Sequence, residues 1–242
     1  MVHGTALSQA IWRGLGYVRD LGQDHRVITL DLRGHGRSDK PHDPAAYRMD
    51  LFVSDILAVM DTLNVSRAHY VGYSLGGRVG FSLSSAHPDR LNRFVSAGGA
   101  PRTGPNAFDN VFFPGCIDVL ERDGMPGFLR GWEARNGSPV DTSTRAAFLA
   151  DDAIALAAYM RESQDDPGVS DSDLRRMTTR TLLLAGSEDR ERVAAAQHAL
   201  RLMPAAVMDV LEGATHADTL RHPEAKSAIR EFLDDGAVAD LT

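Results

Sequence analysis

Short apolar runs alternate with longer amphipathic stretches along most of the 242-residue sequence. The short runs are typical of strands in a buried parallel sheet, and they predict strands at Arg26–Leu32, Ala68–Tyr73, Leu91–Ala97, Thr181–Ala185 and Ala206–Leu211. Between them, apolar residues recur at helical spacing, which predicts helices at about Gln9–Leu21, Asp50–Leu63, Leu75–Ala86, Arg192–Met203 and Ala217–Leu233. This alternation favours an α/β fold with a mostly parallel, doubly wound sheet that has helices on both faces.

The alternation of strands and helices stops between residues 104 and 180. This stretch contains a group of aromatic residues followed by the alanine-rich segment Thr144–Glu162, and its pattern predicts short helices without a sheet. We therefore expect a core formed by residues 1–103 and 181–242, and a small helical insertion formed by residues 104–180.

One predicted turn has the sequence expected around a nucleophile. Residues Gly72–Gly76 read G-Y-S-L-G and lie between a predicted strand and a predicted helix, which is the setting that a G-x-S-x-G motif needs. Side chains two residues either side of Ser74 would collide in so tight a turn, which explains the two glycines. We predict that Ser74 is a nucleophile above the sheet edge. A glycine-rich turn kept for close packing is the alternative interpretation.

A nucleophilic serine needs a base, and His216 is the best placed of the nine histidines. It follows a predicted strand late in the chain, on a loop that begins at Gly213. The other histidines lie in predicted loops or on polar faces, and no pair of them has the spacing of a metal site. We therefore predict His216 as the general base, and no metal centre.

The base in turn needs an orienting carboxylate, for which Asp189 is the leading candidate. It lies in the loop that follows the predicted strand Thr181–Ala185. Glu188, one residue earlier, is an alternative acid. Asp209 lies inside a predicted strand, and Asp218 is better placed to cap the last helix.

Five short motifs follow one another along the chain. They are the H-G turn His3–Thr5, the D-x-R-G-x-G-x-S loop Asp31–Asp39, the elbow Gly72–Gly76, the acid loop Gly186–Asp189 and the histidine loop Gly213–His216. In these motifs the chain resembles the α/β-hydrolase superfamily, and in particular its small, cap-bearing serine hydrolases. The order Ser74, Asp189, His216 is also the order of that superfamily. The resemblance covers nearly the whole chain.

The resemblance implies several further features of the site. The backbone N–H groups of Thr5 and Leu75 would form an oxyanion hole. The insertion at residues 104–180 would be a cap that roofs the nucleophile, excludes water and selects the substrate. The Asp31–Asp39 loop is expected to brace the site, with His35 as its candidate for substrate contact. No cofactor is implied.

The beginning of the sequence departs from the superfamily pattern, in which two strands and a full third strand precede the H-G turn. Here Met1 and Val2 precede it. The fold is therefore expected to be N-terminally truncated, so that Arg26–Leu32 and Ala68–Tyr73 present unpaired backbone groups to each other. We expect the 242-residue chain to be less stable than an N-terminally extended form.

Charge and composition narrow the classes of partner. The chain has 26 Lys and Arg residues against 33 Asp and Glu residues, a net charge of −7, which argues against nucleic acid or an anionic membrane surface. The single cysteine, Cys116, together with the lack of a signal-peptide pattern, favours a cytoplasmic location. The expected partner is a small-molecule substrate.

The sequence thus predicts a cofactor-free serine hydrolase that acts on a small-molecule ester, or on a related acyl or C–C substrate, through an acyl-enzyme. Serine in place of aspartate at position 74 argues against the usual haloalkane dehalogenase and epoxide hydrolase chemistry, whereas perhydrolysis would use the same residues. The alternative is a non-catalytic ligand-binding or degenerate protein of the same fold.

Overall fold

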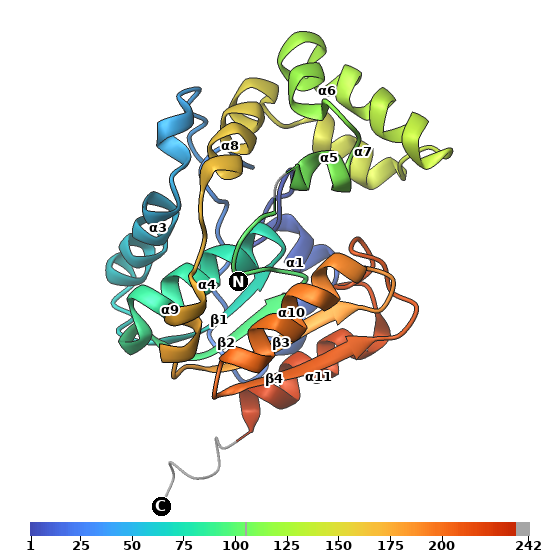
Figure 1. Ribbon diagram of the computed structural model, residues 1–242. Coiled ribbons are helices and arrows are strands. Elements are labelled where there is room, and N and C mark those ends of the chain that lie inside the picture. The colour runs from blue at the N-terminus through green and yellow to red at the C-terminus, as the bar shows by residue number, and fades with distance from the viewer. Residues whose placement is uncertain (105, 236–242) are drawn as a thin grey trace, which may run out of the picture.

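A parallel sheet of four strands forms the centre of the part of the molecule that is described (Figure 1). The computed structural model describes residues 1–104 and 106–235. The strands lie side by side in chain order, and each neighbouring pair is parallel. They are β1 (Ala68–Tyr73), β2 (Leu91–Ala97), β3 (Arg180–Gly186) and β4 (Ala206–Leu211). The predicted bounds of these four strands agree with the structure to within one residue, and the α/β fold is confirmed.

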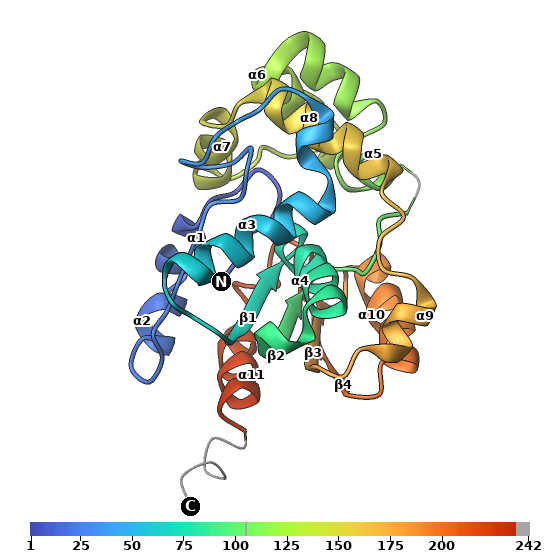
Figure 2. The ribbon, with the colours of Figure 1, turned by 90° about the vertical axis from the view of Figure 1, so that its left-hand side faces the viewer.

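Helices cover both faces of the sheet (Figure 2). Successive side chains of a strand point to opposite faces, so that Leu183 packs in one apolar cluster whereas Leu182 and Leu184 pack in the other. One face carries α3 (Met49–Thr62), α4 (Leu75–Ala86) and α10 (Arg190–Leu202). The other face carries α1 (Ala10–Gly14), α2 (Tyr17–Leu21) and α11 (Pro223–Asp234). The described residues also include two short 3₁₀ helices, η1 (Pro44–Tyr47) and η2 (Pro88–Arg90).

Two predicted helices differ from those in the structure. The predicted helix Gln9–Leu21 divides into α1 and α2, because Gly16 between them has a φ of 81°, outside the right-handed helical region. The predicted last helix begins at Pro223 instead of Ala217. Proline fits the first turn of a helix, and the ring of His222 accepts a hydrogen bond from a backbone N–H of that turn, so the helix is capped here.

The predicted strand Arg26–Leu32 is wrong. Within residues 26–32, all of which are described, Leu30 alone forms a bridge, and its partner is Val2. Val2 also bridges Gly72 on its other side, where its N–H donates to the carbonyl of Val71 at 2.9 Å. No ladder forms along residues 26–32 because the neighbouring segment contributes one bridging residue, and a strand needs a partner along its length.

Four helices form a layer beyond the carboxyl ends of the strands, and we call this layer the cap (Figures 1 and 2). They are α5 (Ala107–Val111), α6 (Cys116–Asn136), α7 (Thr142–Leu149) and α8 (Ala153–Asp165). Phe112, Phe128 and Phe148 form an aromatic cluster inside the cap, with ring centroids 4.9 to 6.3 Å apart. The short helix α9 (Asp171–Arg176) instead packs against α4 and α10 of the core.

The cap is tied to the core by a buried ion pair. Arg78 on α4 is 3% exposed, and its Nη2 lies 2.9 Å from Oδ2 of Asp166, directly after α8. Arg78 also donates to the hydroxyl of Ser163 on α8. Among the described helices, none is both long enough and apolar enough to cross a membrane.

Candidate active site

Ser74 lies in a strained turn between β1 and α4. Its φ of 52° and ψ of −110° are unfavourable for a residue with a side chain. A Cβ atom on Gly72 would lie 2.3 Å from the carbonyl carbon of Gly76, and one on Gly76 would lie 2.2 Å from the carbonyl oxygen of Val2. The two glycines of the motif therefore allow the close approach that the turn requires. The strain is typical of a functional site and holds the Ser74 side chain at the carboxyl end of β1.

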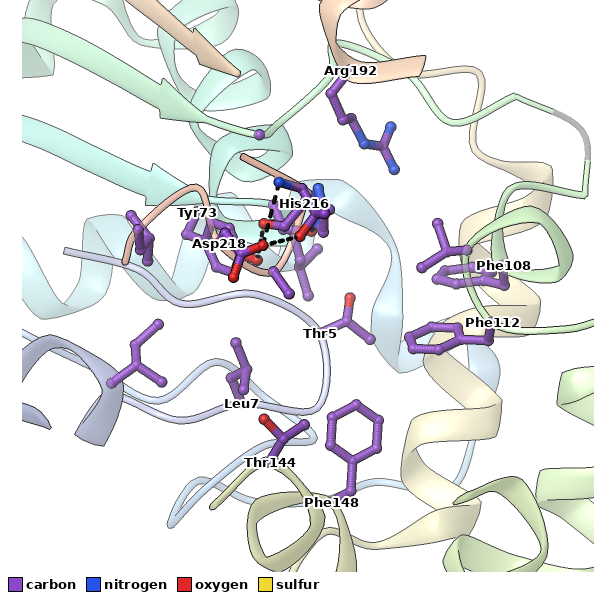
Figure 3. Close-up of a pocket in the computed structure, with 18 of the residues that line it drawn as sticks. Thr5, Leu7, Tyr73, Phe108, Phe112, Thr144, Phe148, Arg192, His216 and Asp218 are labelled. Atoms are coloured by element: carbon purple, nitrogen blue, oxygen red, sulfur yellow. Dashed lines mark hydrogen bonds between the residues drawn. The ribbon is translucent and has the colours of Figure 1, made fainter. Parts of the chain in front are cut away.

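The structure brings Ser74, His216 and Asp189 into one hydrogen-bonded chain (Figure 3). Nε2 of His216 lies 3.0 Å from Oγ of Ser74, and Nδ1 of His216 lies 2.6 Å from Oδ2 of Asp189. In the tautomer that satisfies both contacts, Nδ1–H donates to the carboxylate and Nε2 accepts from the hydroxyl. Glu188, the alternative acid, has an exposed side chain, and the carboxylate that contacts His216 is that of Asp189.

Three loops at the carboxyl ends of strands hold these side chains. Ser74 follows β1, Asp189 follows β3, and His216 follows β4. Asp189 is also the N-cap of α10, where its side chain accepts the N–H of Arg192 at 3.4 Å. Parallel strands place their carboxyl ends along one edge of the sheet, so residues distant in the sequence meet there.

Tyr73 supports the imidazole of His216, a role that sequence reasoning missed. The two rings stack with centroids 5.4 Å apart and an interplanar angle of 27°. The Tyr73 hydroxyl donates to the carbonyl of His216 at 2.9 Å. Burial raises the pKa of Tyr73 well above its usual value, so this hydroxyl stays a donor. The motif treats position 73 as variable, and it carries no signal for this contact.

The two predicted oxyanion donors, Thr5 and Leu75, both line the cavity that contains Ser74. Leu75 is the first residue of α4, so its N–H has no acceptor within the helix. The N–H of Thr5 has no acceptor among the described residues. The hydroxyl of Thr5 is placed differently, because it donates to the hydroxyl of Tyr159 in the cap at 3.3 Å.

Buried histidine side chains hold the segment that carries Thr5. His3 is fully buried; its Nδ1–H donates to the carbonyl of Gly4 at 2.8 Å, and its Nε2 accepts the N–H of Leu32 at 3.0 Å. Burial lowers the pKa of His3 to about 4, so its ring is neutral at pH 7. His35 is also fully buried and packs edge-on against Tyr159, outside the cavity lining. Direct substrate contact by His35, which the motif left open, is not supported.

A cavity of about 520 Å³ lies between the core and the cap and contains Ser74 and His216. Its apolar wall includes Leu7, Ile11, Leu15, Phe108, Phe112, Trp132, Phe148 and Leu220. Figure 3 shows the cap residues Phe108, Phe112 and Phe148 on the far side of Thr5 from His216. The sequence predicts that some aromatic residues of the insertion line the pocket, but its pattern does not distinguish these residues from those that pack inside the cap. Among the described residues, no three His, Cys, Asp or Glu side chains are arranged to hold a metal ion.

Comparisons with known proteins identify the class to which this fold and site belong. The sequence profile of the alpha/beta hydrolase fold family matches residues 1–207. The chain therefore belongs to the alpha/beta hydrolase fold family, as its motifs indicated.

Relatives match over nearly the whole chain. The chain is 24% identical to a putative 2-succinyl-6-hydroxy-2,4-cyclohexadiene-1-carboxylate synthase of Bacillus subtilis (strain 168), over 96% of this chain and 88% of that protein. It is 28% identical to a putative carbamate hydrolase RutD of Pseudomonas syringae pv. syringae (strain B728a), over 96% of this chain and 95% of that protein.

Solved structures match the fold over a similar length. A hydrolase from Pseudomonas aeruginosa PA01 has a TM-score of 0.79 at 27% identity, covering 96% of this chain and 88% of its own. A thermophilic esterase from Thermogutta terrifontis has a TM-score of 0.80 at 25% identity, and the match covers 97% of this chain and 88% of the esterase chain. The hydrolases and esterases among these proteins support hydrolase activity for this α/β hydrolase.

Proposed function

We propose that this protein is a serine hydrolase that cleaves small-molecule esters, or related acyl or C–C substrates, through an acyl-enzyme. The observation that carries the proposal is the hydrogen-bonded chain from Ser74 through His216 to Asp189, beside a cavity of about 520 Å³. A nucleophile, a base and an orienting carboxylate in this arrangement activate a serine hydroxyl. The apolar part of the cavity wall suits an apolar acyl or alcohol portion of modest size.

In the first half-reaction, Oγ of Ser74 attacks the substrate carbonyl carbon while Nε2 of His216 takes the hydroxyl proton. The negative charge that develops on the carbonyl oxygen is stabilised by the N–H groups of Thr5 and Leu75. Collapse of the tetrahedral intermediate breaks the bond to the leaving alkoxide, which receives the proton from His216. An acyl group remains on Ser74.

In the second half-reaction, water takes the place of the alcohol. His216 accepts a proton from the water as its oxygen attacks the acyl carbonyl, and then returns that proton to Oγ of Ser74 as the carboxylic acid leaves. Asp189 stays ionised throughout and stabilises the imidazolium. One ester and one water are converted to one acid and one alcohol.

Covalent labelling by a fluorophosphonate tests the proposal, because this reagent reacts with activated serines. We expect labelling of Ser74 in the parent chain and none in Ser74→Ala. Turnover of 4-nitrophenyl esters should fall at least about a thousandfold in the same variant. Ser82→Ala, a half-buried serine on α4 outside the cavity, is the matched control and should retain both labelling and turnover.

Two outcomes would contradict the proposal. Turnover within about tenfold of the parent in Ser74→Ala would exclude Ser74 as the nucleophile. A folded parent chain that takes no label and cleaves no ester would favour the alternative, a ligand-binding protein with a degenerate site.

A further inference from the structure

Three arginine side chains line the cavity, and they differ in how their charge is balanced. Arg78 forms the buried ion pair with Asp166 described above. Within residues 1–104 and 106–235, neither Arg192 nor Arg221 has a carboxylate within 4.0 Å, and neither guanidinium donates a hydrogen bond. Two cationic groups on the cavity wall therefore keep their hydrogen-bonding capacity.

Arg192 is the better placed of these two arginines. It is half-buried in the first turn of α10, three residues after Asp189. Figure 3 shows its side chain pointing from α10 into the cavity, on the side of His216. A cation near a helix N-terminus interacts unfavourably with the helix dipole. The position of Arg192 therefore gains the fold neither an ion pair nor a favourable dipole interaction.

Two acidic side chains line the cavity, Asp141 and Asp218, and neither forms an ion pair with Arg192 or Arg221. Asp141 caps α7 by accepting the N–H groups of two residues in its first turn. Asp218 accepts the hydroxyl of Thr215 at 2.5 Å. Both carboxylates are thus engaged locally, and the two guanidinium groups on the core side of the cavity, unpaired among the described residues, face an aromatic wall on the cap.

We propose that Arg192, assisted by the exposed Arg221, binds a carboxylate of the substrate. The inference rests on the proposed function and narrows it to small esters that carry a carboxylate in addition to the reacting acyl group. A guanidinium presents paired N–H donors that match the two oxygens of a carboxylate. Because Arg192 is half-buried, salt screens its charge less than that of a fully exposed group.

Matched pairs of esters test this binding site on either side of the scissile bond. 4-Nitrophenyl hemisuccinate is compared with 4-nitrophenyl butyrate for the acyl side, and 4-carboxyphenyl acetate with phenyl acetate for the alcohol side. The parent enzyme should prefer the anionic member of at least one pair. In Arg192→Gln, the ratio of kcat/KM for that anionic ester to its neutral partner should fall about ten- to a hundredfold, mostly through KM.

Two further variants separate charge from geometry. Arg192→Lys retains the charge and loses the planar donor pair, so the ratio should fall by less than in Arg192→Gln. Arg190→Gln is the matched control, because Arg190 lies in the same turn of α10 but is exposed and outside the cavity lining. The ratio should not change in this control.

The inference is overturned if the parent prefers the neutral ester in both pairs. It is also overturned if Arg192→Gln slows both members of a pair equally, because that result would mean that Arg192 acts through the neighbouring Asp189. Calorimetric binding of monomethyl succinate and dimethyl succinate to Ser74→Ala needs no turnover. Tighter binding of the monoanion, lost in the double variant with Arg192→Gln, would support the carboxylate site even if no ester were hydrolysed and the proposed function failed.

Discussion

The two flanks of β1 hold their parts of the site in different ways. On one flank, β2, β3 and β4 continue the sheet through unbroken parallel pairing, and the loops after β3 and β4 carry Asp189 and His216. On the other flank, Val2 bridges Gly72 and Leu30, and the chain then turns to Thr5. The predicted general base and its carboxylate thus depend on a regular ladder, whereas a predicted oxyanion donor does not.

Side chains replace the ladder on the N-terminal flank. The ring of His3 bonds the backbone of Leu32, and Oδ1 of Asp31 accepts the N–H of Gln9 at 2.7 Å. Beside this flank lies a second cavity of about 280 Å³, between residues 26–30 and β1. Its lining includes Met1, Val2, Ile28, Leu30, Ile56, Met60, Tyr70 and Val71. Loss of one side chain should therefore matter more to stability on this flank than on the ladder flank.

Asp189→Asn should give the largest effect, and it should affect catalysis without unfolding the protein. An asparagine cannot hold the same tautomer of His216 or stabilise its positive charge, so we expect kcat to fall about ten-thousandfold. Asparagine caps helices as well as aspartate does, so α10 should retain its cap and the melting temperature should change little. Ester kinetics and a thermal melt measure the two effects. Glu188→Gln is the control; a larger loss in that variant would identify Glu188 as the acid.

Thr5→Pro tests the predicted oxyanion donor on the N-terminal flank. Proline lacks the N–H, and loss of one oxyanion donor lowers kcat about a hundred- to a thousandfold. Thr5→Ala keeps the N–H and loses the hydroxyl contact with Tyr159, so its kcat should stay within about threefold of the parent. If both variants lose activity equally, the side chain matters and the N–H assignment is wrong. Fluorophosphonate labelling of Thr5→Pro would verify that Ser74 is still in place.

His3→Leu should destabilise the N-terminal flank by about 1–3 kcal/mol, because it leaves the buried N–H of Leu32 without an acceptor. The carbonyl of Gly4 loses one donor but still accepts the N–H of Leu7. Urea denaturation measures this loss. His3→Gln retains a donor and an acceptor and should recover part of it. His87→Gln, at a half-buried histidine with no side-chain hydrogen bond to a described residue, is the control.

The free energy of unfolding should also depend on pH through His3. Burial lowers the pKa of folded His3 to about 4, whereas an unfolded histidine has a pKa of about 6.5. Between these values the unfolded chain binds the proton more readily, so stability is complete above about pH 6.5 and falls as the pH is lowered toward 4. We expect a loss of about 2 kcal/mol between pH 8 and pH 5 from this group. An unchanged pH slope in His3→Gln would contradict the assignment.

The smallest expected effect concerns the cavity beside Val2. A chain with an added N-terminal segment of alternating Val and Thr, in register with Val2, would pair with residues 26–30 and β1. The added pairing should raise the melting temperature. In a chain of this size, each kcal/mol of added stability corresponds to a rise of about 2–4 °C. An added Gly–Ser segment of equal length is the control. Equal melting temperatures would show that this flank needs no ladder.

Much of the fold could be predicted from the sequence because its signals are local. A strand buried on both faces favours an apolar run, which is continuous in β3 and shorter, between polar residues, in β1 and β2. Arg26–Leu32 has the same composition, yet it forms no ladder, because pairing depends on a neighbour that the apolar pattern cannot report. Gly16 divides one predicted helix and Pro223 delays the start of another, and apolar periodicity alone reports neither effect.

The sequence by itself also determined the three side chains that meet at the site. The tight turn around Ser74 admits glycine at two positions, and loops after parallel strands converge at one edge of the sheet. The tertiary structure alone decided the rest. Tyr73 stacks on His216, Tyr159 accepts the hydroxyl of Thr5, and Arg192 lacks an ion-pair partner among the described residues. Apolar periodicity is a pattern among residues that are close together in the sequence. These contacts, or their absence, depend on segments that are far apart in the chain.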